Sequence, residues 1–181
     1  WIGEPGADGF EHLLAQGNDA PLEAIVADRD IVQLLYTSGT TANPKGVLTS
    51  HLAATMAGLS NALAQQCGPD VVTLVALPLF HCAMLNSISI PVLLQGGTVV
   101  LTQGFEPHQT ARLLEEHRVQ LVVLLPMMYG LLLADPELKS RTFPAMKRAM
   151  YAMAPMPEER LHQIHAMFPN ADVVLGSGQT E

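Results

Sequence analysis

The residues best suited to chemistry lie in one short stretch, YTSGTTANPKGV, which occupies positions 36–47. It combines several hydroxyl side chains, two glycines, a proline and Lys45, and apolar segments flank it on both sides. Backbone N–H groups, hydroxyl groups and a lysine together suit the oxygens of a phosphate group, because they supply hydrogen bonds and positive charge. Residues of these types also form ordinary solvated turns. A phosphate-binding loop and a solvated turn are therefore the two interpretations that the residues leave open.

Two common phosphate-binding patterns and one nucleophile pattern do not fit. In G-x-x-x-x-G-K-[ST], counted from Gly39, the second glycine would fall on Pro44, and Lys45 is followed by a glycine where a hydroxyl residue is required. The dinucleotide pattern G-x-G-x-x-G does not occur in the chain. Ser38 and Ser177 both lack the G-x-S-x-G context of a hydrolase nucleophile. A phosphate-binding loop here must therefore belong to another class.

The elements that must position these residues follow from the hydrophobic pattern. Short apolar runs bounded by Gly, Pro or polar residues predict buried strands, and apolar residues at helical spacing predict helices. Strands are expected at 31–37, 71–78, 98–102, 119–126, 147–154 and 171–177. Helices are expected near 9–14 and at 51–65, 83–95, 106–118, 127–135 and 157–168. Strands that alternate with helices in this way predict an α/β fold, with a mostly parallel sheet flanked by helices.

The helix expected at 51–65 shows the two signals most clearly. Ser50 is a suitable N-cap, because a serine hydroxyl accepts a hydrogen bond from an early backbone N–H group. Four apolar residues then share one face of the helix: Leu52, Met56, Leu59 and Leu63.

Three polar stretches follow predicted strands, at 37–46, 79–82 and 176–181. In parallel sheets ligands bind beyond the carboxyl ends of the strands. We therefore expect these three stretches to converge on one site.

Composition excludes several other classes of protein. The chain has 181 residues, of which 49% are hydrophobic and 14% charged, and its formal net charge is −8. Nucleic-acid binding is not expected, because it needs clustered Lys and Arg. No apolar run reaches the roughly 18 residues needed to span a bilayer, and the start has neither a Met nor a signal-peptide pattern. Two cysteines form no disulfide framework, so a cytoplasmic location is expected.

The stretch at 36–47 resembles the phosphate-binding loop of the adenylate-forming superfamily, which includes acyl-CoA synthetases, luciferases and the adenylation domains of peptide synthetases. The family pattern is close to T-S-G-T-T-G-x-P-K-G, and this chain matches it at eight positions: Thr37, Ser38, Gly39, Thr40, Thr41, Pro44, Lys45 and Gly46. LPLFH at 77–81 resembles the segment with an aromatic–histidine gate, YAMAPMP at 151–157 resembles a segment that lines the nucleotide and acyl sites, and GSGQTE at 176–181 resembles the Y-G-x-T-E element. The resemblance covers residues 30–181.

The resemblance implies a reaction in which a carboxylate attacks the α-phosphate of ATP, pyrophosphate leaves, and coenzyme A captures the acyl-adenylate. It implies catalytic roles for Lys45, His81 and Thr180, a position for Phe80 and His81 beside the acid, and Mg²⁺ binding by Glu181. The residues implied to contact the nucleotide are Thr37, Ser38, Gly39, Thr40, Thr41, Lys45, Ala152, Ala154, Pro155, Ser177, Gly178, Gln179 and Thr180.

Three residues depart from the family pattern. Ala42 stands in place of a usual glycine, Ser177 in place of a usual aromatic residue, and Ala152 in place of a common glycine beside the nucleotide. We expect weaker ATP binding or an altered acyl pocket, because an aromatic stack on the base contributes about 1–3 kcal/mol.

Some side chains keep two interpretations. His81 is either a gate or a structural hydrogen-bonding group. Cys82 is more often an apolar filler than a nucleophile. The spacing of His162 and His165 occurs in some metal sites, but a solvated helix face is favoured because no third ligand is evident.

The resemblance also implies that the chain is a piece of the large N-terminal domain of such an enzyme, with a lead-in at 1–30 and a nucleotide- and acyl-binding core at 31–181. The small C-terminal domain of the family would be absent, so the chain alone is expected to be inactive. Two alternatives remain: an adenylation domain that loads a carrier-protein thiol, and a non-catalytic nucleotide or acyl binder.

Overall fold

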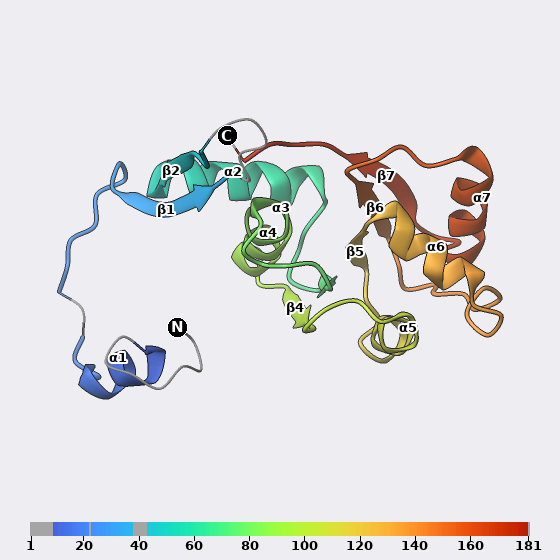
Figure 1. Ribbon diagram of the computed structural model, residues 1–181, viewed down its shortest axis with the longest axis horizontal. Helices are drawn as coiled ribbons and strands as arrows, with labels where there is room; N and C mark the ends of the chain where they lie inside the picture. Colours follow the sequence, from blue (N-terminus) through green and yellow to red (C-terminus); the bar gives the residue numbers. More distant parts are fainter. Residues whose placement is uncertain (1–8, 22, 38–42, 181) are drawn as a thin grey trace.

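The computed structural model describes residues 9–21, 23–37 and 43–180, and its centre is a five-stranded parallel sheet with strand order β4-β3-β5-β6-β7. The five strands are β3 (Val72–Val75), β4 (Thr98–Leu101), β5 (Leu121–Leu124), β6 (Arg148–Ala152) and β7 (Asp172–Gly176). The predicted α/β fold with a mostly parallel sheet is confirmed (Figure 1).

Helices follow the strands in the predicted order. They are α2 (His51–Ala64), α3 (Cys82–Met84), the π-helical turn η1 (Leu85–Ser89), α4 (Ile90–Leu94), α5 (Pro107–Glu116), α6 (Pro126–Ala134) and α7 (Glu158–Met167). The predicted helix at 83–95 is confirmed, although it is divided into α3, η1 and α4. None of the helices in the described part of the chain is both long and apolar enough to cross a membrane.

Successive residues of β5 show how the sheet separates two hydrophobic cores. All four residues of β5 are buried. Val122 and Leu124 belong to a core with residues of α5, α6 and α7, whereas Leu121 and Val123 belong to a second core with residues of α3, η1 and α4. This is the period of two expected of a strand that is covered on both faces.

The first predicted strand exists but is not a buried member of this sheet. β1 (Ile31–Tyr36) pairs antiparallel with β2 (Gly46–Ser50), a strand that the sequence analysis did not predict, and the two form a separate sheet. Leu34 is 49% exposed and Tyr36 67%. The prediction of burial was wrong because a short apolar run does not reveal what covers it.

The N-cap and the apolar face of α2 are both present as predicted, but the apolar face is not buried. Ser50 caps the helix as expected, because its Oγ accepts a hydrogen bond from the backbone N–H of Ala53. The four apolar residues on one helix face are all exposed, at 40% to 82%: Leu52, Met56, Leu59 and Leu63.

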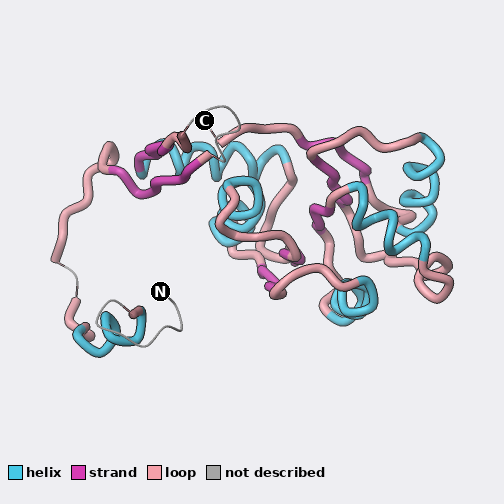
Figure 2. The backbone as a smooth tube through the Cα atoms, viewed as in Figure 1, coloured by secondary structure: helices cyan, strands magenta, loops and turns pink. Residues whose placement is uncertain are grey.

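The short helix expected near 9–14 is confirmed as α1 (Phe10–Gln16). Figure 2 shows this helix lying apart from the rest of the molecule.

Candidate functional site

The base of the loop at 37–46, which is expected to bind phosphate, is closed by two hydrogen bonds between Thr37 and Lys45. The N–H of Thr37 donates to the Lys45 carbonyl at 3.0 Å, and the N–H of Lys45 donates to Thr37 Oγ1 at 3.2 Å. The side chain of Lys45 is exposed and has no ion-pair partner in the described part of the chain. Lys45 therefore presents an exposed cation that has no acidic partner among the described residues. Five residues of the loop lie outside the described residues: Ser38, Gly39, Thr40, Thr41 and Ala42.

The segment at 77–81, which is expected to carry the gate and is called the gate segment below, follows β3 and ends at the start of α3. His81 caps this short helix, because its Nδ1 accepts a hydrogen bond from the backbone N–H of Ala83 at 3.1 Å. With Nδ1 as the acceptor, a neutral imidazole carries its proton on Nε2. His81 thus makes a structural hydrogen bond through Nδ1, and in this tautomer Nε2–H remains as a donor for a ligand. Phe80 is 81% exposed beside it.

The segment after β7 returns across the molecule and reaches the gate segment. Figure 1 shows it running from β7 back toward α2 and β2. Cys82 Sγ lies 3.9 Å from Thr180 Oγ1 and 4.0 Å from the Gln179 carbonyl oxygen. Two of the three polar stretches, at 79–82 and 176–181, are therefore brought together. Glu181 lies outside the described residues.

The residues expected beside the nucleotide at 152–155 lie at the carboxyl end of β6. Ala152 pairs with Gly176 of β7, so this stretch begins next to the segment that carries Ser177 and Gly178. The chain then turns sharply, because Met153 has a φ of 76°, a left-handed conformation that is uncommon for a residue other than glycine. Ala154 and Pro155 follow it and are exposed. The parallel register thus groups two of the expected nucleotide-contacting stretches.

A cleft of about 510 Å³ lies beyond the carboxyl ends of β3 and β4. Leu79 and Phe80 line one wall, and Leu101 and Thr102 line the other. Phe80 was expected near the acid from the resemblance, whereas Leu101 and Thr102 were not predicted as lining residues. The polar residues at the end of the strand at 98–102 could have indicated this part of the cleft, because the carboxyl ends of neighbouring parallel strands lie side by side.

The described part of the chain offers no metal centre. Among residues 9–21, 23–37 and 43–180, no three His, Cys, Asp or Glu side chains gather closely enough to hold a metal ion. His162 pairs instead with Glu158 at 3.7 Å on an exposed face of α7, which agrees with the solvated face favoured from the sequence.

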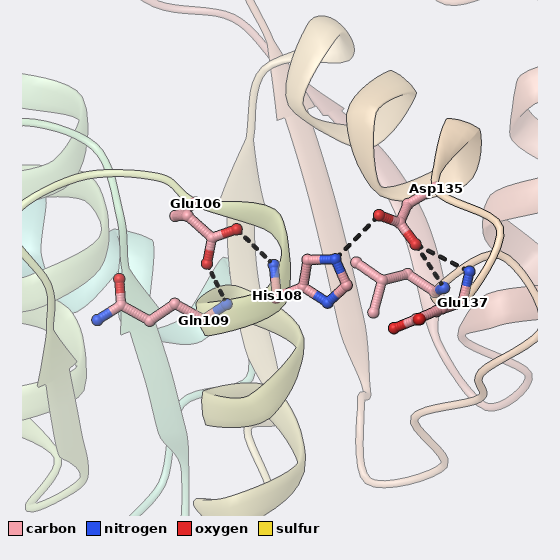
Figure 3. Close-up of polar contacts among 6 residues, drawn as sticks. Glu106, His108, Gln109, Asp135 and Glu137 are labelled. Carbon is pink, nitrogen blue, oxygen red and sulfur yellow. Dashed lines mark hydrogen bonds and ion pairs between the residues drawn. The ribbon is translucent and has the colours of Figure 1, made fainter.

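A polar cluster at the start of α5 lies outside this site and stabilises the fold (Figure 3). Glu106 caps α5 by accepting hydrogen bonds from the N–H groups of Gln109 and His108, which lower the pKa of its carboxyl group. His108 Nε2 lies 3.0 Å from Asp135 Oδ2 at the end of α6. Desolvation raises the pKa of Asp135, but the N–H groups of Glu137 and Leu138 and the ring of His108 outweigh it, and the pKa is lowered.

With this geometry in view, comparison with known proteins identifies the class. Residues 4–181 match the family described as AMP-binding enzyme, and the chain belongs to that family. The resemblance found in the sequence is thereby confirmed.

Relatives and solved structures narrow the class further. A feruloyl-CoA synthase from an Amycolatopsis species is 34% identical over 81% of this chain and 30% of its own length, and an indoleacetate–CoA ligase from Aromatoleum aromaticum is 30% identical over 94% and 34%. The inhibitor-bound N-terminal domain of FACL13 from Mycobacterium tuberculosis has a TM-score of 0.80 at 27% identity, over 96% of this chain and 44% of that one. An O-succinylbenzoate coenzyme A synthetase (MenE) from Bacillus subtilis, in complex with ATP and magnesium, has a TM-score of 0.76 at 26% identity, over 88% and 33%. This chain therefore spans about a third of the length of the curated relatives it matches, and its structural neighbours are adenylate-forming enzymes.

Proposed function

We propose that the chain is part of an acid–thiol ligase that uses ATP to convert a carboxylic acid into an acyl-adenylate, releases pyrophosphate, and transfers the acyl group to coenzyme A. The observation that carries this proposal is the contact of Cys82 with Thr180, which joins the gate segment to the segment after β7. Membership of the AMP-binding enzyme family supports it.

The donors at the site fit the phosphates of ATP. Lys45 supplies an exposed positive charge, and Thr37 and Thr180 supply hydroxyl groups. A Cβ atom added at Gly178 would meet nothing within 4 Å, so a ligand can approach this backbone closely. Charge neutralisation and positioning account for most catalysis in phosphate chemistry, and these residues provide both.

Each residue has a separate task in the proposed reaction. Lys45 neutralises the β- and γ-phosphates and the departing pyrophosphate, together with the loop residues expected from the sequence. Thr180 donates a hydrogen bond to the α-phosphate as its charge develops. His81 donates from Nε2 to the carboxylate of the acid, and Phe80 borders that group. Glu181 would hold Mg²⁺, because a carboxylate oxygen suits this hard cation.

The acid is best sought among aromatic carboxylic acids. The relatives named above act, by their names, on feruloyl and indoleacetate groups, both of which carry an aromatic ring. Fatty acids form the second group to test, in keeping with the acyl-CoA synthetase resemblance.

We also propose that residues 1–181 form part of the large N-terminal domain of a cytoplasmic enzyme, with 1–30 as a lead-in and 31–181 as the nucleotide- and acyl-binding core. This assignment is supported by the chain's coverage of only 30% and 34% of the length of the two relatives named above. The small C-terminal domain of that enzyme would then complete the catalytic cycle.

ATP–pyrophosphate exchange by the full-length protein, measured with a panel of aromatic and fatty acids, tests the proposal. We expect exchange with at least one acid, and about 10- to 100-fold slower exchange in Thr180→Ala because a donor to developing charge is lost. Thr142→Ala, at an exposed loop position, is the matched control and should keep the wild-type rate. Exchange followed by transfer only to a carrier protein would favour the loading alternative, and absence of exchange with every acid would favour a non-catalytic binder.

A further inference from the structure

The hairpin of β1 and β2 is joined to the helical segment after β3 by a pair of side-chain amides. Gln33 Nε2 donates to Asn86 Oδ1 at 2.9 Å, and Asn86 Nδ2 donates to Gln33 Oε1 at 2.9 Å. Both side chains are partly buried, and 53 residues of sequence separate them. A reciprocal pair of this kind fixes both the distance and the orientation of the two elements, which an apolar contact does not do.

Gln33 occupies an unusual place in its strand. Along β1 only Gln33 and Leu35 are half-buried, while the other four residues are exposed. The inward face of the strand thus offers one polar and one apolar residue to the rest of the chain. Replacing one amide with an apolar group would leave the other without its partner, which is destabilising in a partly buried position.

Asn86 stands on an element that is held firmly from the other side. η1 is a π-helical turn, closed by the hydrogen bond from the N–H of Ile90 to the Leu85 carbonyl. Ser89 is buried and its Oγ donates to the Met84 carbonyl at 2.7 Å, and the Gln65 side chain donates to the Ser87 carbonyl. π-helical turns insert one extra residue and occur frequently at functional sites, since they redirect the side chains on them.

The two joined elements carry different parts of the proposed site. Gln33 lies within β1, and Thr37 directly follows the end of that strand, at the base of the proposed phosphate-binding loop. Asn86 lies about one helical turn after Cys82, which follows the gate segment directly and contacts Thr180. A displacement of about 1 Å between reacting groups can lower a rate by about 100-fold, so the position of one part relative to the other matters for catalysis.

We propose that Gln33 and Asn86 form a positioning pair that sets the phosphate-binding loop in register with the gate segment. This inference rests on the proposed acid–thiol ligase function. Neither residue touches the reacting atoms, so the phosphate-binding loop and the gate segment each keep their own contacts with the substrates when the pair is broken. Only the alignment between the loop and the gate segment is lost. The predicted signature is a lower kcat for adenylation with little change in the KM for ATP or for the acid.

Pyrophosphate exchange by the full-length protein provides the first test, in Gln33→Leu, Asn86→Leu and a double variant that exchanges the two amides, Gln33→Asn with Asn86→Gln. We expect each single variant to lose at least tenfold in kcat, and the exchanged pair, which keeps two amides of the same total length, to recover most of that loss. Gln120→Leu removes a similar side-chain hydrogen bond, from Gln120 to the Asp70 carbonyl, at the amino-terminal ends of β5 and β3 and away from the proposed site, and should keep the wild-type kcat. Equal kcat values in Gln33→Leu and Gln120→Leu, or no recovery in the exchanged pair, would overturn the proposal.

Hydrogen exchange of backbone amides in the same variants provides a second test that does not depend on activity. Asn86→Leu should accelerate exchange at the amides of β1 and β2 by at least threefold, whereas Gln120→Leu should not. If the wild-type protein shows no pyrophosphate exchange with any acid, the proposed function fails, and unchanged protection of β1 and β2 in Asn86→Leu would separately overturn the pair.

Discussion

The parallel sheet and the β1–β2 hairpin are built from similarly apolar strands but differ in what covers them. In β5 every residue is buried, between helices on both faces of the sheet. In the hairpin, Leu34, Tyr36 and Leu48 are 49% to 67% exposed. The sheet therefore has its own core, whereas the hairpin depends on a few contacts such as the Gln33–Asn86 pair.

The difference separates the parallel sheet with its helices, which form the stable frame of the molecule, from the hairpin that carries the proposed phosphate-binding loop. Regions with few buried apolar contacts open more readily than core strands, and binding loops are commonly drawn from such regions. The helix α2, which carries the exposed apolar residues Leu52, Met56, Leu59 and Leu63, lies beside the hairpin (Figure 1). Contiguous exposed apolar residues commonly mark a contact with other protein, which fits the proposal that this chain is part of a larger domain.

Loss of Lys45 should have the largest effect on function and almost none on the frame. In Lys45→Ala we expect pyrophosphate exchange to fall by about 100- to 1,000-fold, because the cation beside the phosphates is removed. The midpoint of thermal unfolding should stay within about 2 °C of wild type, because Lys45 is exposed and contributes nothing to the core. Lys139→Ala, an exposed lysine in another part of the chain, should change neither quantity. A large fall in the unfolding temperature of Lys45→Ala would contradict the separation of frame and loop.

The same leucine-to-alanine change in the two regions measures their difference directly. Leu124 in β5 is fully buried, so Leu124→Ala should lower the free energy of unfolding by about 3 kcal/mol. Leu48 in β2 is 63% exposed, and Leu48→Ala should cost less than about 0.5 kcal/mol. Urea unfolding checks both values. Equal losses in the two variants would show that the hairpin is covered by other protein in solution.

The turn between α4 and β4 provides a smaller test of close packing in the frame. A Cβ atom at Gly97 would lie 2.6 Å from the Val71 carbonyl oxygen and 2.7 Å from Val92 Cγ1. Gly97→Ala should therefore lower the free energy of unfolding by about 2 kcal/mol, since backbone must move to admit the methyl group. Gly68→Ala is the control, because nothing lies within 4 Å of its Cβ position. A Gly97→Ala variant as stable as Gly68→Ala would contradict this packing.

Acid should weaken the cap of α5 by a small amount. The pKa of Glu106 is lowered in the folded chain, so its contribution to stability is complete above the ordinary value of 4.5 and is lost as the pH falls through the lowered pKa. Asp135 contributes in the same direction. The unfolding temperature of Glu106→Gln, followed from pH 6 to pH 3, should therefore depend less steeply on pH than that of wild type. Identical pH profiles would show that the carboxylate cap has no role in stability.

Sequence reasoning located nearly every element of the frame, because short apolar runs ended by Gly or Pro are strong signals. It missed β2, since GVLTS contains a glycine and two hydroxyl residues and has no long apolar run. It placed β1 in the wrong sheet, because burial depends on neighbours that a single strand does not specify.

For the candidate site, the sequence indicated which residues to expect but not how the folded chain brings them together. Lys45, His81 and Thr180 could be named because the short strings that contain them resemble motifs of the adenylate-forming family. The approach of Thr180 to Cys82 depends on the path of the chain after β7, and the Gln33–Asn86 pair depends on the extra residue of a π-helical turn. Neither feature leaves a periodic signal in the sequence.

The strand order β4-β3-β5-β6-β7 also has a consequence for the newly made chain. Every strand after β3 pairs with one that the ribosome has already released, so the sheet can grow outward as translation proceeds. Lys45 emerges before any of these strands, and Thr180 emerges after all of them. A nascent chain therefore contains both of these proposed nucleotide contacts only after β7 has been made, so the proposed nucleotide site can be completed only once the sheet is in place.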